Sequence, residues 1–61
     1  MRTYLVVAKD NLEAGPHTWT KGFDYEVVEK TDYFTLASNE GSLNYFNEIK
    51  NAVLENFKVI E

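Results

Sequence analysis

The sequence predicts a small all-β domain, in which five short strands form a barrel and one short helix precedes the last strand. Three observations predict this class. Short segments rich in β-branched and aromatic residues recur along the 61 residues, with turn-forming residues between them. Apolar residues mostly alternate with polar ones, and they follow a helical spacing in one segment near the C-terminus. A closed barrel is favoured over an open sheet because closure gives the first and last strands partners; the alternative is a meander of strands with the helix packed across it.

Residues 1–61 are predicted to form a single domain that is stabilised by side-chain packing. A domain of this length buries only about 60% of the surface that its unfolded chain exposes. The sequence has no cysteine and one histidine, so disulfides and zinc are not expected to supplement the core. One tryptophan, four tyrosines and four phenylalanines provide large apolar surfaces instead.

The first predicted strand covers residues 3–8, a run of β-branched and aromatic residues. Residues 9–18 show no sustained periodicity and contain Gly15-Pro16, so they predict a loop of about ten residues. A loop of this length in so small a domain more often carries function than a short one. The alternative is a solvated connector pinned by Leu12 and Pro16.

A Lys-Gly turn at residues 21–22 is predicted to start the next strand, because glycine accepts a positive φ. The strand covers residues 23–27, where apolar residues occupy every second position. Val28 breaks the alternation, which predicts either a bulge or a curl of the sheet that covers both valines. The inward face is predicted to carry Phe23, Tyr25 and Val27, and the outward face Asp24 and Glu26.

Residues 33–37 and 43–46 are predicted to be two further strands, joined by a hairpin turn at residues 38–42. In the first of them, alternation places Phe34 and Leu36 in the core and Tyr33 outside, beside the long loop. Residues 47–56 then change to the spacing of a helix of about two turns, with Asn47 as its N-cap. Its apolar face would carry Ile49, Ala52, Val53 and Leu54, and the closing strand at residues 56–61 would place Phe57 and Val59 on one face.

Residues 19–30 read Trp-Thr-Lys-Gly-Phe-Asp-Tyr-Glu-Val-Val-Glu-Lys, and residues 39–46 read Asn-Glu-Gly-Ser-Leu-Asn-Tyr-Phe. Residues 19–30 resemble the SH3 signature, in which an aromatic residue is followed by a Lys-Gly turn and then by an alternating strand. In style the chain is similar to the small SH3-like barrel proteins encoded by bacteriophages and other bacterial mobile elements. The resemblance covers the whole chain coarsely and implies an SH3-like five-stranded barrel. Trp19 is expected to plug one end of this barrel, the alternative being an exposed indole that binds a partner.

The chain departs from peptide-binding SH3 domains where those domains form their ligand groove. Residues 8–12 (Ala-Lys-Asp-Asn-Leu) stand in place of an Ala-Leu-Tyr-Asp-Tyr stretch. Residues 33–34 (Tyr-Phe) stand where a tryptophan normally opens the third strand, and residues 47–50 (Asn-Glu-Ile-Lys) replace Ser-Asn-Tyr. Because stacked aromatics make that groove, these differences argue against recognition of proline-rich peptides.

The charge of the chain disfavours nucleic acids and membranes as partners. Six Lys/Arg against ten Asp/Glu give a net charge of −4, whereas affinity for phosphates comes from Lys and Arg. The apolar run at residues 4–8 is too short for a secretory signal, which needs about 7 to 15 apolar residues, or for a membrane-spanning helix, which needs about 20. We therefore expect a cytoplasmic protein.

No catalytic, cofactor-binding or metal site is predicted. His17 is the one imidazole that could activate a nucleophile or hold a metal. A weak metal or acid–base site with Asp10 and Glu13 can be drawn, but the favoured interpretation is an exposed histidine in a loop.

We expect a non-enzymatic interaction module that binds and modulates a protein of a bacterial host or a phage, with inhibition of a defence system as one form of this function. The alternatives are an accessory protein that forms homo-oligomers through its edge strand or helix, and a nucleic-acid-binding barrel, which the charge opposes. The binding surface would combine the 9–18 loop, an outward tyrosine and the turn at residue 47. Its predicted residues are Asn11, Glu13, His17, Tyr33, Asn47 and Lys50.

Overall fold

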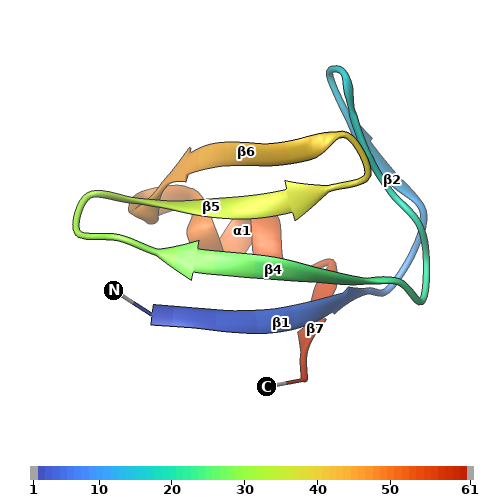
Figure 1. Ribbon diagram of the computed structural model, residues 1–61, viewed down its shortest axis with the longest axis horizontal. Helices are drawn as coiled ribbons and strands as arrows, with labels where there is room; N and C mark the ends of the chain where they lie inside the picture. The colour runs from blue at the N-terminus through green and yellow to red at the C-terminus, as the bar shows by residue number, and fades with distance from the viewer. Residues whose placement is uncertain (1, 61) are drawn as a thin grey trace.

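A computed structural model describes residues 2–60, and β-strands dominate it (Figure 1). The mainly β prediction, with one short helix before the last strand, is confirmed. The main antiparallel sheet has the order β6-β5-β4-β1-β7, and β2 and β3 form a separate hairpin. A 3-10 turn, η1, leads into helix α1. The elements are β1 (Arg2–Ala8), β2 (Leu12–Ala14), β3 (His17–Trp19), β4 (Asp24–Glu29), β5 (Tyr33–Ser38), β6 (Gly41–Phe46), η1 (Asn47–Ile49), α1 (Lys50–Leu54) and β7 (Phe57–Val59).

Strand pairing does not close the main sheet into a barrel. Within residues 2–60, β6 pairs with β5 and β7 pairs with β1, so these two strands form the edges of the sheet. The register of β1 against β4 runs without interruption from Arg2↔Glu29 to Val7↔Asp24. Val28, which breaks the alternation, therefore sits in a regular ladder and is half-buried. Of the two alternatives for Val28, the curl of the sheet is the one that agrees with this register.

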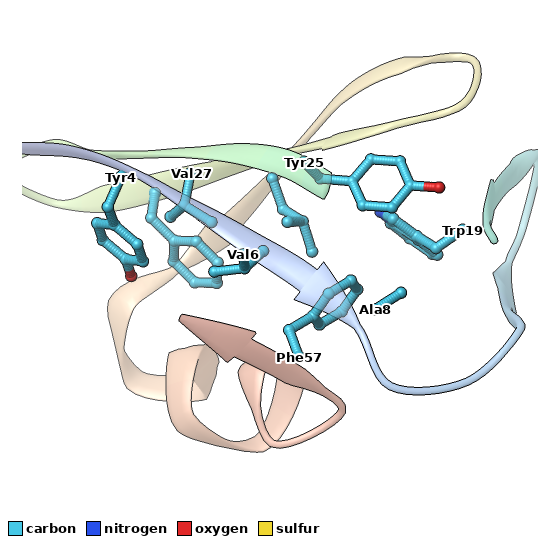
Figure 2. Packing of buried hydrophobic residues seen from close by; sticks show 9 residues of the cluster. Tyr4, Val6, Ala8, Trp19, Tyr25, Val27 and Phe57 are labelled. Carbon is cyan, nitrogen blue, oxygen red and sulfur yellow. The ribbon is translucent and has the colours of Figure 1, made fainter. Parts of the chain in front are cut away.

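The core lies on one face of the sheet, where alternate residues of β1, β4 and β5 are buried, as their period-2 pattern predicts. Figure 2 shows these side chains gathered along the inner face. Phe57 of β7 meets the rings of Trp19 and Tyr25 edge-on, with centroids 6.0 Å and 6.4 Å away. The buried set is Tyr4, Val6, Ala8, Trp19, Tyr25, Val27, Phe34, Leu36 and Phe57.

The predicted loop at residues 9–18 is wrong, because most of it forms the β2–β3 hairpin. Leu12 pairs with Trp19, and Ala14 pairs with His17. Gly15 has a φ of 59° at the first central position of the turn, followed by Pro16. A positive φ at that position is typical of the type II′ hairpin turn. Strands of three residues are too short to give a clear alternation in the sequence.

Three other expectations are wrong: the burial of Phe23, the length of the helix and its N-cap. Phe23 does not join Tyr25 in the core but is 59% exposed, because it belongs to the turn before β4. The predicted helix is shorter, since η1 precedes five residues of α1, and Ile49 is 41% exposed. Asn47 does not cap this helix, because its Nδ2 donates to the carbonyl of Thr31 instead. Of the predicted apolar face, Val53 and Leu54 pack against the core.

The closing strand is three residues long and only half of its predicted apolar face is covered. Phe57 is buried, whereas Val59 is 52% exposed. Glu61, the last residue of the predicted strand, lies outside the described residues.

The corner before β4 depends on Gly22, whose φ is 85°. The amide of Phe23 donates to the carbonyl of Thr20, which places Gly22 at the position of a type II turn that requires a positive φ. A Cβ at Gly22 would meet no atom within 4 Å, so substitution has a conformational cost and no steric clash.

We predict that Gly22→Val lowers the free energy of unfolding by about 1 to 2 kcal/mol, since a β-branched residue resists this φ. Gly22→Asn should cost less, because asparagine tolerates the left-handed region. Urea unfolding followed by Trp19 fluorescence measures both. An unchanged midpoint for Gly22→Val would contradict this account of the corner.

Candidate functional site

Trp19 fixes the β2–β3 hairpin to the end of the main sheet. Its indole is 4% exposed, and its Nε1 donates to the carbonyl of Ala37 at 2.7 Å. Figure 2 shows the indole beside Tyr25 at the end of the core nearest the hairpin. The expectation that the Trp19 side chain is buried is confirmed, and the alternative of an exposed indole is wrong; the sheet that it packs against is not closed into the expected barrel.

A second set of contacts joins β3 to the turn between β5 and β6. The hydroxyl of Ser38 donates its one proton to the carbonyl of Gly41, at 2.9 Å. His17 Nδ1 lies 2.6 Å from the same hydroxyl oxygen and must therefore be the donor in that contact. The imidazole also stacks on Trp19, with centroids 6.4 Å apart. His17 thus orients the hairpin.

Glu40 completes this junction with a carboxylate that accepts two hydrogen bonds from Thr18. The amide of Thr18 donates to Oε1 at 2.7 Å, and the Thr18 hydroxyl donates to Oε2 at 2.6 Å. These bonds favour the charged form, so they lower the pKa of Glu40, and the positive charge of a nearby protonated His17 acts in the same direction. The two-residue turn at residues 39–40 is therefore held on both sides.

The hairpin and α1 together flank an apolar groove with a volume of about 310 Å³. We call it the hairpin groove. Trp19, Leu36 and Phe57 are buried residues of the core that reach its floor. Its walls come from β2 on one side and from α1 on the other. The lining residues are Leu12, Glu13, Ala14, Trp19, Leu36, Tyr45, Val53, Asn56 and Phe57.

Three polar side chains give the hairpin groove its chemistry. Glu13 is its one charged lining residue and is exposed, and Asn56 is also exposed. Tyr45 stacks on Phe34 at 5.3 Å, and partial burial raises the pKa of its phenol. Among residues 2–60 that hydroxyl has no hydrogen-bond partner, so it can donate to a ligand. Alternation in β6 places Tyr45 on the inner face, but the sequence gives no signal that its hydroxyl is free.

The hairpin brings three predicted site residues to one end of the sheet. Glu13 lines the hairpin groove, whereas His17 bonds to Ser38. Asn11 Oδ1 accepts a hydrogen bond from the amide of Lys21 at 2.9 Å, which supports the corner before β4. Of these three, Glu13 has a side chain available for a partner.

The other three predicted site residues lie at the opposite end of β5. Tyr33 begins this strand and pairs with Phe46, while the hairpin contacts Ala37 and Ser38 at the far end. The expectation that Tyr33 stands beside residues 9–18 is therefore wrong. It lies instead near the turn that starts at Asn47, as expected. A shallow hollow of about 250 Å³ is lined there by Tyr33, Asn44, Tyr45 and Phe46.

Lys50 forms an ion pair rather than a free cationic surface. Its Nζ lies 2.8 Å from Glu29 Oε2, which also accepts a hydrogen bond from the Tyr4 hydroxyl at 2.9 Å. The bonds from Lys50 and Tyr4 lower the pKa of Glu29. Burial, followed by the hydrogen bond and the negative charge of Glu29, raises the pKa of Tyr4 to about 12. This cluster fastens the start of α1 to the end of β4.

Comparisons with family models, with curated proteins and with solved structures each returned no match. None of the helices in residues 2–60 has the length and apolar character needed to cross a membrane. In the same residues no group of three or more histidine, aspartate or glutamate side chains is arranged to hold a metal ion.

We predict that acid loosens the hairpin through Glu40. Because folding lowers the pKa of Glu40, its contribution is present above the ordinary glutamate value of 4.5 and is lost as the pH falls through the lowered value. Amide exchange at Thr18, corrected for its intrinsic rate, should accelerate over that range. Glu40→Gln is the matched control, in which the acceleration should be absent. A Glu40 titration midpoint at or above 4.5 would contradict the prediction.

We predict a separate loss of stability in alkali through Tyr4. Its raised pKa means that the contribution is complete below pH 10 and declines as the pH rises toward about 12. Tyr4→Phe should remove this part of the alkaline decline, and urea unfolding between the two pH values measures it. An equal decline in the variant would assign the effect to other groups.

Proposed function

We propose that this protein is a non-enzymatic interaction module that binds a protein partner through the hairpin groove. The observation that carries the proposal is the groove itself, whose lining is mostly apolar and includes the largely buried rings of Trp19 and Phe57. A volume of about 310 Å³ is near the lower end of ligand pockets, which span about 300 to 1,000 Å³. It suits one or two apolar side chains of a protein segment.

The polar residues suggest the chemistry of that segment. Glu13 at the edge of the groove favours a Lys or Arg beside the apolar anchor, in keeping with the net charge of −4. The Tyr45 phenol and the Asn56 amide can bond to the backbone of the bound segment. The partner segment would therefore be apolar with a basic flank, and would not need to be rich in proline.

The non-enzymatic part of the proposal is supported by the position of His17. The chain has one histidine, and its Nδ1 is committed to Ser38. The Ser38 hydroxyl that His17 faces donates its proton to the carbonyl of Gly41 and accepts from the imidazole, so the pair is not arranged as a nucleophile and its general base.

The order of the elements supports an SH3-like barrel of the kind encoded by phages and other mobile elements. A long excursion follows β1, a three-strand meander from β4 to β6 comes next, and a helical turn precedes β7. A protein of a bacterial host, or of the phage, would be the partner in that case. Modulation of a host enzyme, including inhibition of a defence system, is the corresponding role.

Selection of random peptides on the immobilised protein tests the proposal. We expect the selected peptides to share an aromatic or aliphatic residue next to Lys or Arg, with affinities that fall at least about tenfold in Ala14→Phe, because the new ring occupies the groove. Asn51→Phe, on an exposed position of α1 outside the lining, is the matched control and should bind normally. Chemical-shift changes should map to Leu12, Val53 and Asn56. Peptides that bind Ala14→Phe as well as the wild type would refute the groove as the binding site.

A further inference from the structure

The two edge strands of the main sheet differ in how they are protected. β7 has three residues and carries Lys58, and short length and lysine both discourage pairing with another chain. β6 has six residues, Gly-Ser-Leu-Asn-Tyr-Phe, with no charge and no proline. Its register with β5 is unbroken from Gly41 to Phe46, so no bulge twists it away from the plane of the sheet.

The free side of β6 presents unpaired backbone groups. The two-residue turn joins Ser38 to Gly41, and alternation along the ladder directs the N–H and C=O groups of Ser42, Asn44 and Phe46 away from β5. Within residues 2–60, the N–H groups of these three residues and the C=O groups of Ser42 and Asn44 have no other partner. The C=O of Phe46 is already bonded, because Phe46 is the N-cap of η1 and its carbonyl accepts the first bond of that turn. All three are exposed, and Phe46 is 68% exposed. Figure 1 shows β6 at one margin of the sheet, with the hairpin near its first residues only.

We propose that β6 pairs antiparallel with β6 of a second copy of this chain, about a two-fold axis at Asn44. The edge is self-complementary in this register. Asn44 faces Asn44 of the second copy, and Leu43 faces the half-buried ring of Tyr45 on the inner face. On the outer face, the exposed ring of Phe46 faces the small Ser42. The Asn44 N–H and C=O groups of the two copies then bond to each other, and the Phe46 N–H of each copy donates to the Ser42 C=O of the other.

Charge favours a second copy as the occupant. Two chains that each carry −4 repel each other, and this repulsion is least at a seam without charge; β6 and β5 behind it contain no charged residue. The nearest carboxylates, Glu40 and Glu48, lie just beyond the two ends of β6 and would face each other across the seam. The dimer should therefore tighten as salt screens them. A six-residue seam is small, so the association is weak and depends on concentration.

Sedimentation from about 1 μM to about 1 mM tests the dimer, a range that covers weak to moderate dissociation constants. Asn44→Lys and Asn44→Asp place like charges opposite each other, so each alone should dimerise about five- to tenfold more weakly. An equimolar mixture of the two should restore dimerisation, because the opposite charges then pair. Thr35→Lys and Thr35→Asp are matched controls on the same face, because these side chains lie about 14 Å from their counterparts across the seam and should leave it unchanged.

A measurement without substitutions supplements this test. In the concentrated protein the amides of Asn44 and Phe46 should gain protection from hydrogen exchange, while those of Leu43 and Tyr45 are protected at every concentration by β5. A wild-type protein that stays monomeric throughout the range would overturn the proposal. So would a dimer that both Asn44 variants leave intact, or a monomer that pairs β6 only with strands of other proteins. Failure of the dimer would leave peptide binding by the monomer unchanged, although Tyr45 belongs both to the seam and to the hairpin groove.

Discussion

The Trp19 indole is buried, so its N–H needs a hydrogen-bond acceptor inside the protein. The position of the hairpin relative to the main sheet depends on the contacts that provide both the burial and the acceptor. The carbonyl of Ala37 accepts its N–H, and the edge of Phe57 packs against its ring. Trp19, eleven residues after the end of β1, thereby fixes the hairpin to β5 and to β7. Without this anchor the hairpin would have no apolar contact deep enough to hold it, and the hairpin groove would lack one wall and part of its floor.

Polar contacts around this anchor determine where the hairpin lies. The Tyr25 hydroxyl accepts from the amide of Thr20 and donates to Asn39 Oδ1. The backbone N–H of Asn39 in turn donates to the backbone carbonyl of Thr18. These contacts join the buried Tyr25 and the turn residue Asn39 to the backbone of residues 18 and 20. The hairpin is therefore positioned by a rigid network, which favours a preformed binding groove over one that orders on contact.

The sequence predicts the strands well and the site only in part. The period-2 pattern identifies β1, β4 and β5, because their buried faces are continuous. It fails for Phe23, where alternation extends past the end of a strand, and for β2 and β3, which are too short to show a pattern. The sequence predicts Glu13 as a site residue and the structure places it in the lining of the hairpin groove, whereas the free hydroxyl of Tyr45 depends on distant neighbours. The sequence also could not show that Tyr33 and the hairpin lie at opposite ends of β5.

β1 pairs with β4 on one side and with β7 on the other, so the strand made first has a neighbour that is made last. Phe57 in β7 is also the ring that both Trp19 and Tyr25 pack against. During translation, the earlier strands can form their meander but must wait with an incomplete core until residue 57 has left the ribosome. Such pairing over a long sequence separation gives a high contact order, which slows folding and prolongs the exposure of apolar surface to chaperones and proteases.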